Sequence, residues 1–195
     1  MFLATEELIK EITSNEIVDI VSANTIQGAS IDLRISEKAK ILLPQDKPID
    51  LSKEQDFEPY YKEVDLSKDF ILKAGEFLYS ETIEYVKIPE DKAGILLPRS
   101  SLARMGLILP GSMYANPAYE GHLPIVIHNS TKNDFIIPPY YRIMQLLLVE
   151  LKGKAKPYHE QMDAKYFKES NIKPPILDSS DEDEDELLKK LAKYE

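Results

Sequence analysis

The sequence predicts a mainly β fold, a sandwich or a barrel, on three observations. From residue 31 onward, short apolar or alternating runs recur between Gly, Pro, Asn and Asp, as is typical of strands joined by turns. Hydrophobic residues make up 43% of the 195 residues, enough for one core of ordinary size. Helical spacing of apolar residues is clear only near the start of the chain. We therefore expect one β domain with few helices.

The first expected element is a short helix in the segment TEELIKEI, residues 5–12. Thr5 is a suitable N-cap, because its side-chain oxygen can accept a backbone N–H, and two glutamates follow in the first turn. Leu8, Ile9 and Ile12 recur at helical spacing. We expect this helix to pack on the flank of the domain.

Seven segments are expected to supply the strands. They are SIDLRI, AKILLP, FILKAGEFLYSETIEYVKIP, AGILLP, HLPIVIHN, DFIIPP and RIMQLLLVEL. The polar stretch 45–69, with two prolines, is expected to run over the surface. In HLPIVIHN, alternation places Leu123, Ile125, Ile127 and Asn129 on one face and the intervening residues on the other. One of these faces must look into the core.

A second short helix is expected in RSSLAR, residues 99–104. A serine before a short helical stretch is a natural N-cap, and Gly106 fits a left-handed helix end. Free N–H groups at a helix start attract an anion, and Arg104, four residues after Ser100, projects from the same side with Arg99 as a second guanidinium. The spacing fits an anion site, and it also fits an ordinary capped turn with surface arginines.

The loop that follows, LPGSMYANPAYEGH, contains turn residues at Pro110-Gly111 and at Asn116-Pro117. Tyr119 lies after the second turn. Its ring can pack on a sugar or a base, or simply in the core, and the pattern leaves both open.

Composition narrows the classes of partner. The net charge of −10 argues against nucleic acid, whose phosphates need a basic face. Eight acids and three lysines fall in residues 178–195, which predicts a solvated tail. The absence of cysteine excludes disulfides and the thiolate-bound zinc of the zinc-dependent nucleobase deaminases. No apolar run approaches the roughly 20 residues of a membrane span, so we expect no membrane partner and a cytoplasmic protein.

Six groups of residues, taken in order and with their spacing, resemble the dCTP deaminase branch of the dUTPase-like superfamily. They are GASIDLR (28–34), GEFL (75–78), RSSLARMG (99–106), NPAYEG (116–121), RIMQL (142–146), and PY with DAKY (157–158 and 163–166). The resemblance implies a distorted β-barrel or jelly roll in a domain of residues 1–170, followed by a flexible acidic tail, 171–195. It also implies a homotrimer with sites between subunits, and dCTP or dUTP bound as its magnesium complex.

The same resemblance implies the roles of single residues. Ser100 and Arg104 match a catalytic serine and arginine, and Tyr119 matches an aromatic residue that packs on the deoxyribose. Tyr158 and Lys165 match nucleotide contacts in a C-terminal segment that closes over the triphosphate. The other positions expected to contact the nucleotide are Arg99, Ser101, Leu102, Ala103, Asn116, Pro124, Ile125, Val126, Gln145 and Glu169. No residue of the chain is expected to bind the magnesium, which the triphosphate carries.

The sequence departs from the family pattern at three of these positions. Val126 stands where the family has a strand glutamate that acts as general base, and Asn116 stands where the diphosphatases have an aspartate. Glu169 stands where a glutamine is usual. Neither a valine nor an asparagine can take a proton from water at neutral pH. His128, on the same strand face as Val126, could supply a base instead.

Three hypotheses follow. The first is a dCTP deaminase that converts dCTP and water into dUTP and ammonia, which the pieces at 157–166 favour. The second is a dUTP diphosphatase, forming dUMP and pyrophosphate, or a bifunctional relative. The third is a non-catalytic nucleotide-binding paralogue, which the loss of both carboxylates favours.

Overall fold

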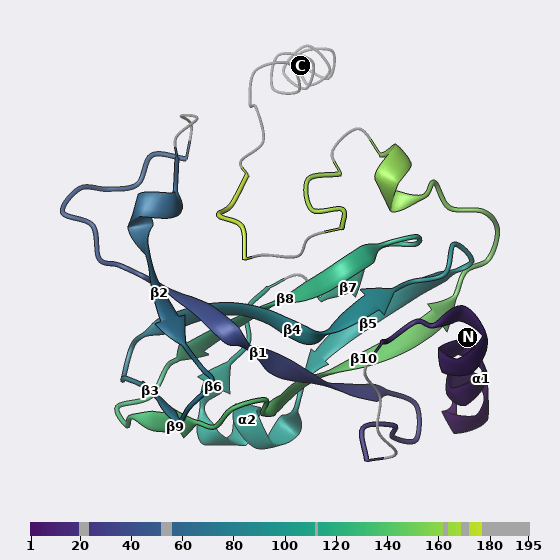
Figure 1. Cartoon of the computed structure of the whole chain (residues 1–195), viewed down its shortest axis with the longest axis horizontal. Helices are drawn as coiled ribbons and strands as arrows, with labels where there is room; N and C mark the ends of the chain where they lie inside the picture. Colours follow the sequence, from purple (N-terminus) through teal and green to yellow (C-terminus); the bar gives the residue numbers. More distant parts are fainter. Residues whose placement is uncertain (20–23, 52–55, 112, 162–163, 169–171, 177–195) are drawn as a thin grey trace, which may run out of the picture.

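Ten β strands dominate the part of the chain that the structure, a computed structural model, describes: residues 1–19, 24–51, 56–111, 113–161, 164–168 and 172–176. The strands are β1 (Ile31–Leu42), β2 (Tyr61–Asp65), β3 (Phe70–Leu72), β4 (Phe77–Lys87), β5 (Lys92–Pro98), β6 (Leu107–Ile108), β7 (Tyr114–Ala115), β8 (Glu120–Asn129), β9 (Phe135–Ile137) and β10 (Arg142–Glu150). One curled sheet has the order β6-β8-β4-β1-β10-β5-β7 with β2 beside β1, and β3 pairs with β9 (Figure 1). The mainly β fold predicted from the sequence is confirmed.

The expected strands differ from the observed ones mainly in where they join. SIDLRI and AKILLP form the single strand β1, which bends where its pairing shifts register between Leu33 and Arg34 and again between Ile35 and Ala39. FILKAGEFLYSETIEYVKIP divides at Gly75, whose φ of 80° reverses the chain between β3 and β4. The sheet therefore curls sharply at β-bulges, which the sequence pattern does not predict.

The described residues of 45–69 run over the surface as expected, except for the buried Phe57 and Leu66, but they include regular structure that was not expected. The short 3-10 helix η1 (Glu58–Tyr60) leads directly into β2, which pairs antiparallel with the second half of β1. β2 is an edge strand, and its sequence YKEVD has no apolar alternation to mark it.

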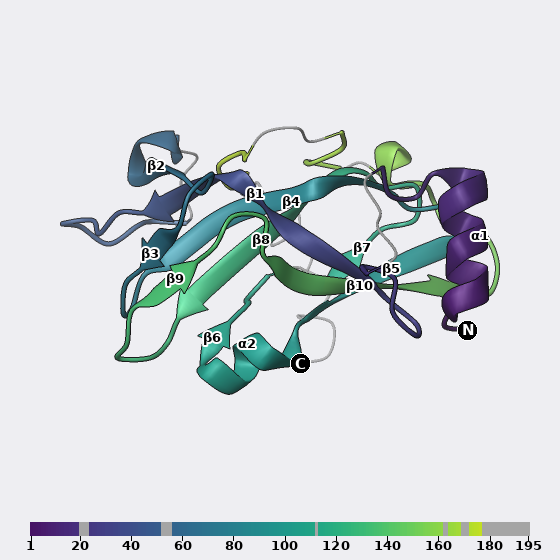
Figure 2. The same cartoon turned by 60° about the horizontal axis from the view of Figure 1, so that its bottom comes forward.

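The N-terminal helix α1 spans Thr5–Asn15 and is longer than expected. Thr5 is not its N-cap: Ala4 holds that position with no side-chain cap hydrogen bond, and the Thr5 hydroxyl donates to the Gly28 carbonyl at 3.0 Å. Leu8 is fully buried, whereas Ile9 is 43% exposed, so the buried stripe is narrower than the spacing predicted. Figure 2 shows α1 standing at one end of the sheet.

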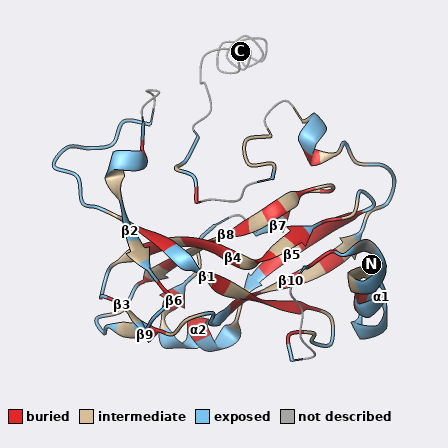
Figure 3. Cartoon of the chain, in the orientation of Figure 1, coloured by how far each residue is buried: buried red, intermediate tan, exposed pale blue. Residues whose placement is uncertain are grey.

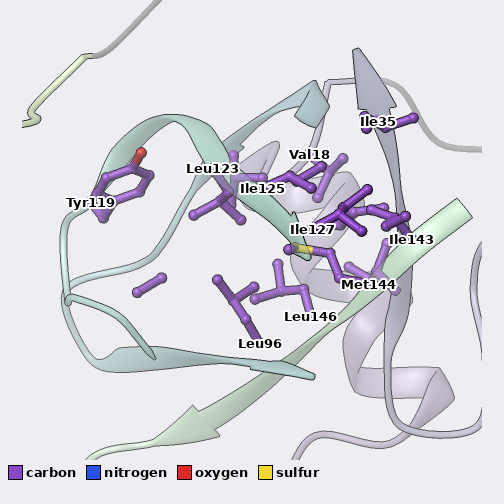
Figure 4. Close-up of a cluster of buried hydrophobic side chains, with 14 of the residues drawn as sticks. Val18, Ile35, Leu96, Tyr119, Leu123, Ile125, Ile127, Ile143, Met144 and Leu146 are labelled. Atoms are coloured by element: carbon purple, nitrogen blue, oxygen red, sulfur yellow. The ribbon is translucent and has the colours of Figure 1, made fainter. Parts of the chain in front are cut away.

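The core lies inside the curl of the sheet. Leu123, Ile125 and Ile127 of β8 are buried on one face, as the alternation predicted, and Figure 4 shows them pointing toward Leu96 and Leu146. Burying each such side chain contributes roughly 1.5–3 kcal/mol to folding. The opposite face of β8 is half-buried, and it is this face that is available to a site.

The C-terminal part of the described chain crosses the outer face of the sheet. It contains the 3-10 helix η2 (Tyr158–Glu160), and the Tyr158 N–H donates to the Pro117 carbonyl at 2.9 Å. Figure 3 shows this segment as mostly exposed or half-buried, above the buried sheet. Of the predicted tail, 171–195, only residues 172–176 are described, and Ile172 among them is buried. No helix in the described residues is long and apolar enough to cross a membrane.

Candidate active site

Asp32 is a fully buried carboxylate that holds two arginines. It lies on β1, and its Oδ2 accepts hydrogen bonds from Arg99 and from Arg142, the latter at 3.1 Å. Gln145 donates to Oδ1 at 3.1 Å and also to the Ser30 hydroxyl at 3.1 Å. A buried charge is stable only when it is paired and hydrogen-bonded, so Asp32 fixes both guanidinium groups in position.

Arg99 and Arg142 line a cavity of about 480 Å³ together with Arg34 and Ser101; we call it the arginine cavity. Arg34 is held by the buried Glu84: its Nε donates to Oε1 at 2.7 Å and its backbone N–H donates to Oε2 at 2.9 Å. Burial raises the pKa of Glu84, and the bonds from Arg34 oppose that rise. Three guanidinium groups thus face two carboxylates, which leaves a positive excess suited to an anion.

The helix α2 (Ser100–Met105) leads away from this cavity. Arg99, not a serine, is at the N-cap position and makes no side-chain cap bond, so the predicted serine cap is wrong. Ser101 lines the arginine cavity, while Ser100, Ala103 and Arg104 are exposed. Leu102 is buried in the core at 5% exposure.

The left-handed helix end at Gly106 is confirmed by a φ of 85°. A Cβ at this position would lie 2.5 Å from Cγ2 of Thr131 in addition to the unfavourable φ. We expect Gly106→Ala to lower the free energy of unfolding by about 1–3 kcal/mol. Urea unfolding measures it, with Gly28→Ala, where nothing lies within 4 Å and φ is not positive, as the matched control. Equal midpoints for both variants would contradict the strain at Gly106.

Tyr119 anchors a second cavity of about 130 Å³, the tyrosine cavity. Its ring lies 5.7 Å from that of Tyr158, and its hydroxyl donates to the His122 carbonyl at 2.7 Å. The Tyr158 hydroxyl in turn accepts the Tyr166 N–H at 3.1 Å. The lining residues are Tyr79, Leu96, Tyr114, Ala115, Asn116, Tyr119, Leu123, Pro124, Tyr158 and Tyr166.

The remaining expected positions are not gathered at one cavity. Pro124 lines the tyrosine cavity. Val126 lines an adjoining small cavity that is also lined by Leu109, Pro110, Gly111 and Met113. Ile125 is fully buried on the core face. Lys165 donates to the Ile176 carbonyl at 3.0 Å, and Glu169 lies outside the described residues.

Neither histidine of β8 lines the tyrosine cavity as the structure describes it. His128 stacks obliquely on Phe77, with ring centroids 6.2 Å apart. His122 has Nδ1 2.9 Å from the Thr82 carbonyl, so this nitrogen carries the proton.

One chain does not bring the two cavities together. The arginine and tyrosine cavities share no lining residue among those described. In Figure 1, α2 lies at the bottom of the molecule, whereas the yellow-green segment with η2 lies at the top. The expected site residues are therefore divided between two sides of the same chain.

Several residues of the site were not singled out from the sequence. Asp32, Arg34 and Arg142 occur in the segments that carried the resemblance, but no site role was expected for them. A signal exists, because Asp32 and Arg34 are charged residues inside the apolar strand SIDLRI. Tyr79 and Tyr166 give no comparable signal.

The fold is that of a solved dCTP deaminase. The structure matches the 2'-deoxycytidine 5'-triphosphate deaminase from Agrobacterium tumefaciens with a TM-score of 0.62 and 19% identity, over 75% of this chain and 47% of that one. The chain thus spans about half the length of that protein.

Sequence relatives define the family. A dUMP-forming dCTP deaminase of Nanoarchaeum equitans is 34% identical over 185 residues, covering 86% of this chain and 93% of the relative. A dCTP deaminase of Hamiltonella defensa is 32% identical over 167 residues, covering 80% of this chain and 86% of the relative. The family model for dCTP deaminase-like proteins matches residues 2–151. The chain belongs to the dCTP deaminase-like family, as the resemblance predicted.

Proposed function

We propose that the protein is a dCTP deaminase whose sites form between the subunits of a homotrimer. The observation that carries the proposal is the division of the family's site positions between two separate cavities of one chain. A neighbouring subunit that placed its arginine cavity against the tyrosine cavity would complete the site, and a ring of three such contacts closes.

The arginine cavity is suited to the triphosphate. Arg99 and Arg142 are held in fixed orientations by Asp32, and planar guanidinium groups bind phosphate oxygens in pairs. The described residues contain no group of three or more His, Cys, Asp and Glu able to hold a metal ion. The proposal that magnesium enters as part of the substrate, bound by the phosphates, rests on the resemblance to the family.

The tyrosine cavity is suited to the base and the deoxyribose. Its walls are mostly aromatic and aliphatic, with the Tyr119 hydroxyl bonded to the His122 carbonyl and the Tyr119 ring beside that of Tyr158, and such walls suit a base and a sugar. Tyr158 and Tyr166 belong to the C-terminal segment, so that segment forms one wall of the nucleoside site.

We propose dUMP as the final product. The Nanoarchaeum equitans relative is a dUMP-forming enzyme, and this replaces the dUTP expected from the sequence. The overall change is dCTP and two waters to dUMP, ammonia and diphosphate. Asn116 lines the tyrosine cavity, where its amide can orient water without taking the proton, so we expect diphosphate release to be the slower step.

Val126 favours a second candidate, a non-catalytic nucleotide-binding paralogue. It is an apolar side chain at the position of the family's general base. Such a protein would bind dCTP without turnover, and would share every feature of the two cavities described above.

The test is incubation of the purified protein with dCTP or dUTP and magnesium, followed by chromatography of the nucleotides. Ammonia and dUMP from dCTP support the proposal, and dUTP as the end product limits it to deamination. Hydrolysis of dUTP with no change in dCTP indicates a diphosphatase. Binding of dCTP in calorimetry without any product indicates the paralogue. Arg99→Ala, which removes a phosphate ligand, is the negative control.

A further inference from the structure

Glu81 is a buried carboxylate on the face of the sheet that carries the tyrosine cavity. It lies on β4 with 7% of its surface exposed. Its direct partner on β8 is Pro124, and Tyr79 pairs with Val126. Paired residues of an antiparallel sheet share a face, so Glu81 shares its face with Tyr79 and Pro124, both of which line the tyrosine cavity.

The Glu81 carboxylate has no hydrogen-bond donor in the described part of the chain, although His122 and Lys38 act on it electrostatically. Every fully buried side-chain oxygen among the described residues has a partner, so the Glu81 oxygens must still reach solvent. Glu84, three residues along, is by contrast bound to Arg34. Glu81 is therefore a largely buried carboxylate that is open to water and shares its face with two residues of the cavity wall, although it is not itself one of the lining residues.

Adding water to a cytosine ring requires a group that takes a proton and gives it back. The residues that line the tyrosine cavity include no carboxylate and no imidazole. Glu81 is diagonal to Val126, and such neighbours have Cα atoms about 7–8 Å apart, within reach of a long side chain. Burial raises the pKa of Glu81, while His122 and Lys38 oppose the rise, and a raised carboxyl pKa lies closer to that of an efficient general base.

The histidines are less well placed. His128 pairs with Phe77, two positions beyond Val126 and away from Pro124. His122 already donates its Nδ1 proton to the Thr82 carbonyl. Neither imidazole neighbours both Tyr79 and Pro124, whereas Glu81 pairs with Pro124 and lies two residues from Tyr79 on β4.

We propose, on the basis of the proposed deaminase function, that Glu81 is the general base and proton carrier of the reaction. The water oxygen bonds to C4 of the cytosine as Glu81 takes a water proton, and the C4–N3 π electrons move to N3, which receives that proton from Glu81. The carboxylate then moves the hydroxyl proton to the amino nitrogen. The C4–N bond breaks, ammonia leaves, and C4 keeps the oxygen as a carbonyl.

The decisive variant is Glu81→Gln, which keeps the shape and removes the base. We expect kcat for ammonia release to fall at least about 100-fold, with the Kd for dCTP changed by less than about threefold. Glu63→Gln, on the exposed face of β2, and His128→Gln are the matched controls and should keep turnover. If the wild type is active and Glu81→Gln keeps its turnover, the inference is overturned while the deaminase function stands. A wild type that binds dCTP without turnover overturns both.

Two further variants guard against a loss of folding. If Glu81→Gln does not fold, Glu81→Asp decides, because its shorter carboxylate should lower kcat about tenfold or more and leave binding intact. Unchanged turnover in Glu81→Asp would then overturn the inference. The double variant Glu81→Val with Val126→Glu moves the carboxylate to the facing strand. If the double variant recovers deamination, the result supports a general base on this face of β4 and β8. If it binds dCTP without turnover, the result counts against a general base there.

Discussion

Asp32→Asn is expected to destabilise the protein by about 3 kcal/mol and to abolish binding of the triphosphate. Asp32 is the shared acceptor of Arg99, Arg142 and Gln145. Removing one partner of a buried ion pair costs about 3–5 kcal/mol, and we take the low end because the Arg142 side chain is 43% exposed. An asparagine also points N–H groups at the guanidiniums, so the two phosphate ligands lose their fixed orientation.

The measurement is urea unfolding alongside calorimetric titration with dCTP and magnesium. Asp91→Asn is the matched control, because Asp91 pairs with Lys92 while 73% exposed and should matter by less than about 1 kcal/mol. An Asp32→Asn protein as stable as the control, with unchanged dCTP affinity, would show that Asp32 does not organise the cavity.

Mixing two inactive variants is expected to restore activity, which gives the second large effect. Arg99→Ala removes one phosphate-binding side chain from the arginine cavity. Asn116→Lys places a longer side chain in the tyrosine cavity and blocks it. If each site takes one cavity from each of two neighbours, equal mixing makes about a quarter of the sites intact. We expect each variant alone to be inactive and the mixture to reach about a quarter of wild-type turnover.

The measurement is ammonia release after co-expression, with mixed trimers identified by mass. A mixture that forms mixed trimers yet stays inactive would mean that both cavities serve a site within one chain. A protein that light scattering finds to be a monomer would contradict the homotrimer itself.

The sequence predicted those strands and helices in which apolar and polar residues alternate at the spacing of a strand or a helix. β8 alternates over its whole length, and the expected division into one core face and one other face is confirmed. Gly106 was correct because a left-handed helix end strongly favours glycine. The prediction that Thr5 is the N-cap was wrong, because its hydroxyl donates to the Gly28 carbonyl instead. Gly28 is 23 residues away, so no local sequence pattern could indicate this hydrogen bond.

The site was predicted as far as local motifs and the resemblance reach. Arg99, Ser101, Tyr119 and Pro124 line the two cavities. Glu81 could not be found this way, because its place beside Pro124 depends on the pairing of β4 with β8, and strand register is a tertiary property. All the assigned nucleotide contacts stay predictions, as do the magnesium complex and the cytoplasmic location, and Glu169 lies outside the described residues.

The placement of the arginine and tyrosine cavities on different sides of one chain bears on the genetics of the protein. In the proposed trimer each subunit contributes to two active sites. Its arginine cavity completes the site shared with one neighbour, and its tyrosine cavity completes the site shared with the other. A chain damaged in both cavities would silence two of the three sites of any trimer that it joined, whereas a chain damaged in one cavity would silence a single site. Alleles of the first kind should behave as dominant over the wild type, and alleles of the second kind should complement each other.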